Sequence, residues 1–265
     1  MSLNFASIVP HPPIIIPGIG AKEDLEKVSK TVIAMRKLAQ KFKDAEIDTL
    51  VVISPHSLIY PDRFNICGMK KLFGTFATFG APDMMMEFNN DFDFAVELDT
   101  AAKKSGVETL LYNNDGEFFE LDHGLMVPLY YLTQNQESSL KIVPLAYAGL
   151  PRADHFAFGQ LIRDIAKKYK GRVGILASGD LSHQLIQSGA GRDFDKKLVT
   201  DIEIGDVKTI LYYDEDFTEN AGECGYRSIL ILLGVLDGSK AKPKILSYEG
   251  PFGVGYLVAN YQLKE

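Results

Sequence analysis

Four of the five histidines in this 265-residue chain lie in short segments rich in proline, glycine or acidic residues. His11 lies in PHPP, His56 in SPHS, His123 in LDHG and His183 in GDLSH. Imidazole is the commonest metal ligand and the usual acid or base near neutral pH. One such histidine alone is more often a partly buried side chain bonded to a backbone carbonyl. Four of them at similar positions predict a metal or acid–base site.

A divalent metal needs a further donor besides two histidines, and the neighbours Glu223 and Cys224 both offer one. With His11 and His56, Glu223 would complete a two-histidine, one-carboxylate face, which leaves open positions and suits Fe(II) and oxygen chemistry. Cys224 would instead favour zinc or copper. A structural role is slightly favoured for Glu223 by spacing alone, because it would complement the dipole of a helix that starts near Gly225.

Acidic residues accompany two of the histidines. Asp180 precedes His183 by three residues and Asp122 directly precedes His123, so either carboxylate is placed to orient a ring or hold its tautomer. Ser182 is next to His183 but lacks the glycine pattern of a nucleophile elbow. A serine nucleophile is therefore not the favoured interpretation.

Buried strands alternate with amphipathic helices along most of the chain, and the histidine segments follow strands or precede helices. This pattern predicts an α/β fold with a mixed sheet, helices on its faces and an antiparallel finish, with ligands at the carboxyl ends of strands. The expected strands span residues 4–9, 49–53, 107–112, 141–148, 172–177, 242–248 and 255–261, and the expected helices span 23–41, 93–104, 125–133, 156–169, 194–204 and 227–236.

The fifth histidine and the second cysteine are expected to lie outside the site. His155 follows Asp154, which we expect to cap a helix, and this predicts an exposed surface position for the histidine. Cys67 is expected to pack inside a strand.

The composition excludes several classes of protein. With 46% hydrophobic residues the chain matches an ordinary folded protein, and its net charge of -7 argues against nucleic acid or an anionic membrane as the main partner. The longest apolar run, residues 229–236, is too short to cross a bilayer, and the first residues do not resemble a signal peptide. Two cysteines make no disulfide framework. We therefore expect one domain over residues 1–265, located in the cytoplasm.

The four histidine segments occur in the same order in class III extradiol ring-cleavage dioxygenases, and the chain resembles this family from residue 8 to about residue 236. The type example is the catalytic subunit of protocatechuate 4,5-dioxygenase. The N-terminal stretch and the ECGYRS segment at residues 223–228 look closest to an uncharacterised branch associated with AMMECR-type and radical-SAM proteins. The Memo proteins are more distant relatives.

The resemblance implies a single α/β/α domain around a mixed, largely parallel sheet with antiparallel C-terminal strands. It implies that His11, His56 and Glu223 hold Fe(II), that His183 is the acid and base over the substrate, and that His123 bonds substrate or oxygen. The partners would then be a small catecholic aromatic compound and O2. A homo-oligomer is compatible with this picture.

One departure from the type enzyme leaves a second interpretation open. In Memo-like relatives a cysteine near the position of Cys224 binds the metal, so Cys224 is the alternative third ligand, and zinc or another divalent ion is the alternative metal. The alternative function is a Memo-like metal-binding or peptide-binding protein without ring cleavage. A zinc hydrolase ranks last, because no carboxylate base is well placed. Asp180, Ser182 and Arg227 are the candidates for substrate contacts.

Overall fold

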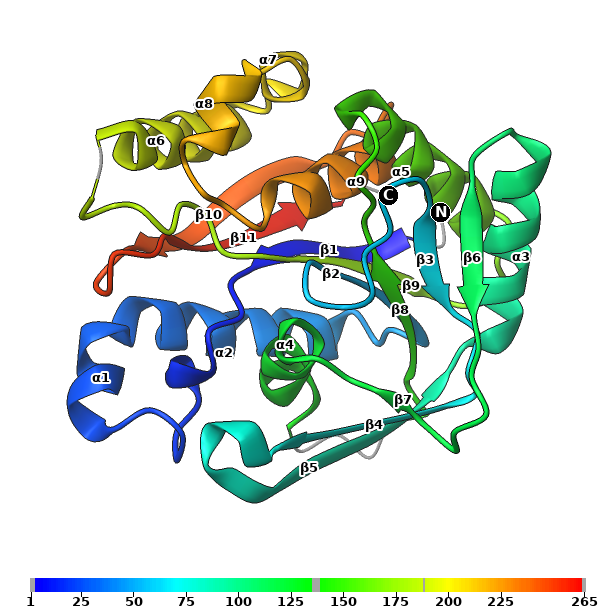
Figure 1. The fold of residues 1–265 in the computed structure, drawn as a ribbon, viewed down its shortest axis with the longest axis horizontal. Coiled ribbons are helices and arrows are strands. Elements are labelled where there is room, and N and C mark those ends of the chain that lie inside the picture. Colours follow the sequence, from blue (N-terminus) through cyan, green and yellow to red (C-terminus); the bar gives the residue numbers. More distant parts are fainter. Residues whose placement is uncertain (1–2, 135–138, 188, 264–265) are drawn as a thin grey trace.

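One mixed β-sheet forms the centre of the protein (Figure 1). The computed structural model describes residues 3–134, 139–187 and 189–263. Within these residues the sheet runs in the order β10-β11-β1-β9-β2-β8-β5-β4-β7, and β3 joins it beside β8 and β6. The strands are β1 (Leu3–Val9), β2 (Thr49–Ser54), β3 (Phe64–Cys67), β4 (Lys71–Phe76), β5 (Ala81–Asn90), β6 (Thr109–Tyr112), β7 (Phe119–Glu120), β8 (Lys141–Ala146), β9 (Val173–Ser178), β10 (Lys242–Glu249) and β11 (Tyr256–Gln262).

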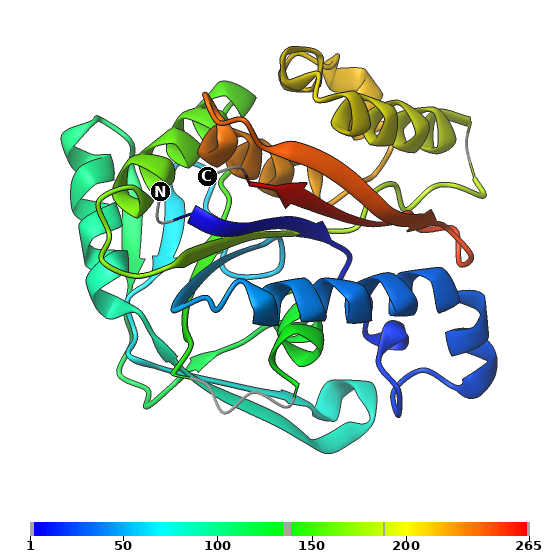
Figure 2. The same cartoon turned by 180° about the vertical axis from the view of Figure 1, so that it is seen from behind.

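Helices cover both faces of this sheet. In Figures 1 and 2, α2 and α4 lie on one face and α5, α6 and α9 on the other. The helices are η1 (Pro13–Ile15), α1 (Lys22–Lys27), α2 (Ser29–Asp44), η2 (Ala77–Phe79), α3 (Phe92–Lys104), α4 (His123–Thr133), α5 (Arg152–Ala166), α6 (Gly189–Ile204), α7 (Val207–Leu211), α8 (Glu215–Glu219) and α9 (Tyr226–Leu236).

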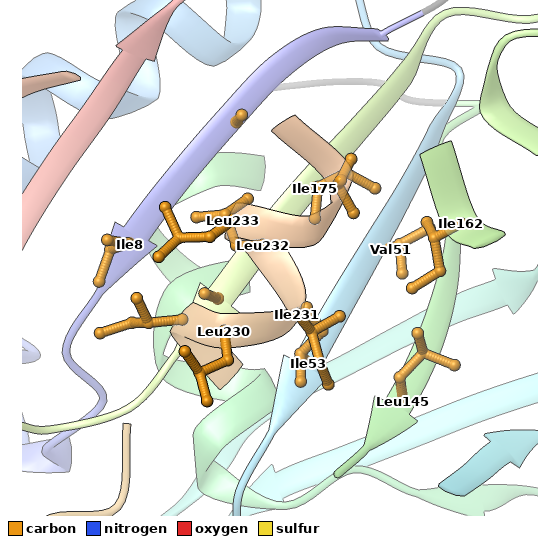
Figure 3. Close-up of a cluster of buried hydrophobic side chains, with 14 of the residues drawn as sticks. Ile8, Val51, Ile53, Leu145, Ile162, Ile175, Leu230, Ile231, Leu232 and Leu233 are labelled. Atoms are coloured by element: carbon orange, nitrogen blue, oxygen red, sulfur yellow. The ribbon is translucent and has the colours of Figure 1, made fainter. Parts of the chain in front are cut away.

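The central strands are buried on both faces, and their side chains divide between two cores. In β2, Val51 and Ile53 belong to the core under α5 and α9, while Leu50 and Val52 belong to the core under α2 and α4. This division follows from the two-residue repeat of a strand, which points successive side chains to opposite faces. Figure 3 shows Val51 and Ile53 with the leucines of α9.

Two glycines let α5 and α9 pack closely on that face. A β-carbon at Gly159 of α5 would overlap the carbonyl oxygen of Ile231, and one at Gly234 of α9 would overlap that of Phe156. The same helix packs against β9 and β1, and the amide of Gly225, just before its first turn, donates to the Asp180 carbonyl oxygen after β9. None of the helices in the described residues is long and apolar enough to span a membrane.

The fold class predicted from the sequence is confirmed: the sheet is mixed and largely parallel, and its strands near the C-terminus are antiparallel. The expected helix over residues 23–41 is instead two helices, because the backbone leaves the helical region at Val28. The hairpin of β4 and β5 was not predicted. Residues 81–90 carry few buried side chains, so they lack the apolar pattern of a core strand.

The prediction of an exposed His155 is wrong. The helix α5 begins at Arg152 with Pro151 as its N-cap, not Asp154, and this turns the ring inward. His155 is fully buried, its Nδ1 lies 2.9 Å from the Pro151 carbonyl oxygen, and its ring meets Phe64 edge to face. Cys67 is buried at the end of β3, as expected.

Candidate functional site

Three neighbouring parallel strands bring the histidine segments to one edge of the sheet. β9 pairs in parallel with β1 on one side and with β2 on the other, so their carboxyl ends lie side by side. His11 follows the end of β1, His56 follows β2 and His183 follows β9. His123 reaches the same edge as the first residue of α4.

Three of these histidines form a compact cluster. One ring nitrogen each from His11, His56 and His123 lies within 4.8 Å of the other two. The Nε2 atoms of His11 and His56 are 3.0 Å apart, and the rings of His56 and His123 are stacked with centroids 4.2 Å apart. Three imidazoles this close cannot all be protonated, so the arrangement favours neutral rings that offer lone pairs.

Hydrogen bonding fixes which nitrogen of His11 faces this cluster. The Ser178 hydroxyl donates to the Gly124 carbonyl oxygen at 2.5 Å, so its oxygen accepts from His11 Nδ1 at 2.9 Å. The proton of the neutral ring is then on Nδ1, and Nε2 presents a lone pair to the cluster. The pKa of His11 is lowered to about 4, mainly by burial; Asp180 opposes this shift and the neighbouring histidines add to it.

The start of α4 is packed directly against this site. Asp122 is the N-cap, with Oδ1 accepting from the Leu125 amide at 3.2 Å and from the Ser54 hydroxyl at 2.6 Å. A β-carbon at Gly124 would overlap the Ser54 hydroxyl, so only glycine permits this approach. Burial lowers the pKa of His123 and also that of His56.

His183 lies beside the cluster as a half-exposed group. Its Nδ1 donates to the Gly222 carbonyl oxygen at 2.8 Å, and its Nε2 lies 3.9 Å from Asp180 Oδ2. The nearby Asp180 carboxylate favours the protonated ring and raises the pKa of His183. The other oxygen of Asp180 accepts from the His11 backbone amide at 3.0 Å, so this buried carboxylate links the two histidines.

Cys224 approaches the same cluster from the loop before α9. Its Sγ lies 3.6 Å from His11 Nε2, and it accepts from the Asp180 amide at 3.2 Å. The loop is held close by two glycines: a β-carbon at Gly179 would overlap the α-carbon of Gly225. Burial raises the pKa of the free Cys224 thiol.

Glu223 points to a different partner. One carboxylate oxygen accepts from the backbone amide of Tyr226 in the first turn of α9, which is the role expected from the helix-dipole alternative. Burial raises the pKa of Glu223 to about 7, although Arg227 and Arg152 oppose the shift. Glu223 lines a pocket with both arginines and does not belong to the three-histidine cluster.

The remaining predicted residues lie around the site in different roles. The buried Ser182 donates its hydroxyl to the Ala221 carbonyl oxygen and its amide to Asp195, so it supports the loop before His183. The guanidinium carbon of Arg227 lies 5.9 Å from the centre of the Tyr147 ring. The Arg227 Nε atom is buried without a hydrogen-bond partner among the described residues.

The donor set fits a divalent metal ion. Three neutral imidazoles converge on one point with a thiol beside them, and His11 has the second-nitrogen hydrogen bond typical of a metal-ligating histidine. His123, expected from the sequence to bond substrate or oxygen, lies within the cluster, and Ser178, which fixes the His11 tautomer, was not predicted. A serine closing a buried strand at the ligand-binding edge was the available signal.

Comparisons with known proteins relate this chain to a family and to individual proteins. Residues 5–259 match the family described as the catalytic LigB subunit of aromatic ring-opening dioxygenase. A Clostridium acetobutylicum protein is 34% identical over 97% of this chain, and the chain spans 57% of that protein's length. The 3,4-dihydroxyphenylacetate 2,3-dioxygenase of Escherichia coli is 23% identical, with 80% of this chain and 82% of that enzyme covered.

A solved structure supports the fold alone. An uncharacterized protein from Escherichia coli K12 superposes with a TM-score of 0.68 at 15% identity, covering 97% of this chain and 99% of the other. The family match covers nearly the whole chain. The chain therefore belongs to the family of the catalytic LigB subunit of aromatic ring-opening dioxygenases.

Proposed function

We propose that this protein is a metal-dependent extradiol dioxygenase that opens the ring of a small catechol with O2. The observation that carries the proposal is the cluster of His11, His56 and His123 in a member of a ring-opening dioxygenase family. His183 and Asp180 stand beside this cluster, where a substrate hydroxyl would need a base.

We propose His11, His56 and Cys224 as the protein ligands of the metal, with Fe(II) as the ion. The 3.6 Å contact between Cys224 Sγ and His11 Nε2 supports the cysteine, while the bond from Glu223 to the Tyr226 amide weakens the case for Glu223. Glu223 remains the alternative third ligand, and zinc the alternative metal.

The protein's own contribution is to hold and move protons beside the bound reactants. A metal in this site supplies Lewis acidity and an electron path between catechol and dioxygen. Because His183 Nδ1 donates to Gly222, its Nε2 is the nitrogen free to take a proton from the catechol and return it when the ring opens. Asp180, 3.9 Å from Nε2, stabilises the ring once it carries that proton, and His123 supplies a hydrogen bond to substrate or oxygen.

Anaerobic loading with Fe(II), followed by oxygen and a panel of catechols, tests this proposal. We expect stoichiometric metal binding and a yellow ring-fission product, measured by absorbance and mass spectrometry. The matched variant His183→Gln should retain the metal and lose most turnover. Stoichiometric metal with no product from any catechol would contradict ring cleavage.

A second function is favoured by one observation, the cysteine thiol beside His11. The thiol is a soft ligand, which also suits zinc or copper. The alternative is therefore a Memo-like metal-binding or peptide-binding protein without ring cleavage. Zinc retained through purification, together with inactivity after Fe(II) loading, would favour it.

A further inference from the structure

An open pocket of about 470 Å³ adjoins the histidine cluster on the His56 side. It lies between the loop after β2, the end of β6, strand β7 and the segment before α4. Aromatic side chains line it, among them Tyr112 and Phe118, and its size suits a single ring with a short side chain. His56 belongs both to this pocket and to the cluster, so a molecule in the pocket is next to the metal donors.

The charged groups in this pocket are acidic. Glu120 and Asp122 line it, and the described lining residues include no lysine or arginine. Asp122 Oδ2 is buried and has no hydrogen-bond partner among the described residues, while Oδ1 accepts from Ser54. Lys71 lies 5.5 Å from the centre of the Phe118 ring, but its ammonium group is paired with Glu117 outside the lining.

We propose that this pocket receives the side chain of the catechol and selects an ammonium group over a carboxylate. The inference rests on the proposed function and names its substrate class, small catechols with a cationic side chain. A carboxylate placed beside Glu120 and Asp122 would meet like charge without a counter-ion. An ammonium group in the pocket is attracted by the negative charge of Glu120 and Asp122 and by the faces of aromatic rings. Arg227, the arginine among the candidates for substrate contacts, lines a different pocket.

A charge-matched series of catechols tests the selection. The probes are dopamine, 4-ethylcatechol and 3,4-dihydroxyphenylacetate, which differ mainly in side-chain charge. Ring fission is measured as kcat/KM with the Fe(II)-loaded protein, and binding is measured anaerobically by titration calorimetry. We expect both kcat/KM and affinity to fall from the cationic to the neutral to the anionic catechol. At low salt each quantity should be roughly fivefold or more higher for the cation than for the anion.

Two glutamine variants assign the effect to the pocket. Glu120→Gln should shrink the ratio between dopamine and 3,4-dihydroxyphenylacetate, while Glu87→Gln, at an exposed position of β5 outside the pocket lining, should leave it unchanged. Both variants remove one negative charge, so the comparison cancels the change in net charge.

The possible outcomes separate the two proposals. Cleavage with an anionic preference, or a ratio unaffected by Glu120→Gln, would overturn the selection and leave ring cleavage standing. Binding in the expected order without any cleavage would support the pocket and overturn ring cleavage. Absence of both binding and cleavage for every probe would overturn both.

Discussion

The protonation of His11 depends on two hydrogen bonds from distant parts of the chain. Ser178 accepts from Nδ1 because its own proton is donated to the Gly124 carbonyl oxygen. The Nε2 lone pair therefore faces His56 and Cys224. Cys224, the proposed third metal ligand, therefore lies on the side of His11 that carries this lone pair.

Replacing Cys224 with serine is expected to lower metal affinity at least tenfold, whereas Glu223→Gln should leave it nearly unchanged. The reason is that Cys224 Sγ approaches His11, while the side-chain oxygen of the substituted glutamine would still accept from the Tyr226 amide as the carboxylate does. Equilibrium dialysis with metal analysis measures the affinity, and Co(II) loading reports a thiolate ligand by its charge-transfer absorption. Weak binding confined to Glu223→Gln would make the carboxylate the ligand.

The buried His155 is expected to make the fold sensitive to acid. Its pKa is lowered from 6.5 to about 4, mainly by burial, so the unfolded state binds more protons between these two values. The free energy of unfolding should therefore fall as the pH falls through this window, by up to roughly 3 kcal/mol from this group.

Denaturant unfolding of wild-type protein and His155→Gln, repeated between pH 7.5 and pH 4, checks this effect. His11 also resists protonation and is present in both proteins. The difference between the two proteins in how steeply the free energy of unfolding changes with pH therefore isolates the contribution of His155. We expect the variant to be less stable at pH 7.5 but to have the shallower pH dependence. Parallel slopes would show that His155 takes up its proton without cost in the folded state.

At the scale of elements, the site depends on how closely the loop before α9 packs on the loop after β9. The amides of Cys224 and Gly225 both point to the carbonyl oxygen of Asp180, at 3.3 and 2.9 Å. Gly179 and Gly225 make this contact possible, since side chains there would separate the loops. The same contact brings Gly222 to His183 and Cys224 to His11.

The substitution Gly179→Ala is expected to weaken metal binding and to lower turnover by tenfold or more, with little change in helix content. Its β-carbon overlaps Gly225, so the loop carrying Cys224 must move, and about 1 Å of displacement is enough to lose this much activity. Gly189→Ala is the matched control, because a β-carbon there meets nothing within 4 Å. Circular dichroism measures the helix content, metal analysis measures the metal binding, and steady-state kinetics measure the turnover. Unchanged metal affinity in Gly179→Ala would show that the contact between the two loops is not needed for metal binding.

At the scale of the molecule, the histidine cluster connects three elements of the fold. His11 follows β1, His56 follows β2, and His123 is the first residue of α4. A metal bound at this cluster favours the folded state, because the unfolded chain does not assemble the donors. The bound ion is therefore expected to stabilise the whole domain.

Removing the metal with a chelator is expected to lower the thermal midpoint by roughly 5 °C at a metal concentration about 100 times the Kd. Calorimetry of metal-loaded and metal-free protein measures the shift. His56→Ala, which removes one donor, should melt at the same temperature with and without metal. An equal shift in that variant would place the stabilising ion elsewhere.

The sequence predicted the parts of the fold that depend on local pattern. Continuous apolar runs such as residues 49–53 identify strands buried on both faces. Apolar residues that recur about every 3.6 positions identify the helices that cover the sheet. The expected segments at residues 107–112 and 242–248 correspond to β6 and β10, with ends shifted by a residue or two. The hairpin of β4 and β5 and the outcome for His155 depended on neighbours that the local pattern does not contain.

By itself, the sequence determined that four histidine segments end strands or begin a helix, since that follows from local residue types. Only the tertiary structure decided which donors meet: Cys224 and His11 are 213 residues apart, and Ser178 and His11 are 167 apart. Such contacts come from the order of parallel strands and from glycines that let backbones touch. Glu223 and Cys224 are neighbours in sequence, yet the turn before α9 directs one to a helix amide and the other to the histidines.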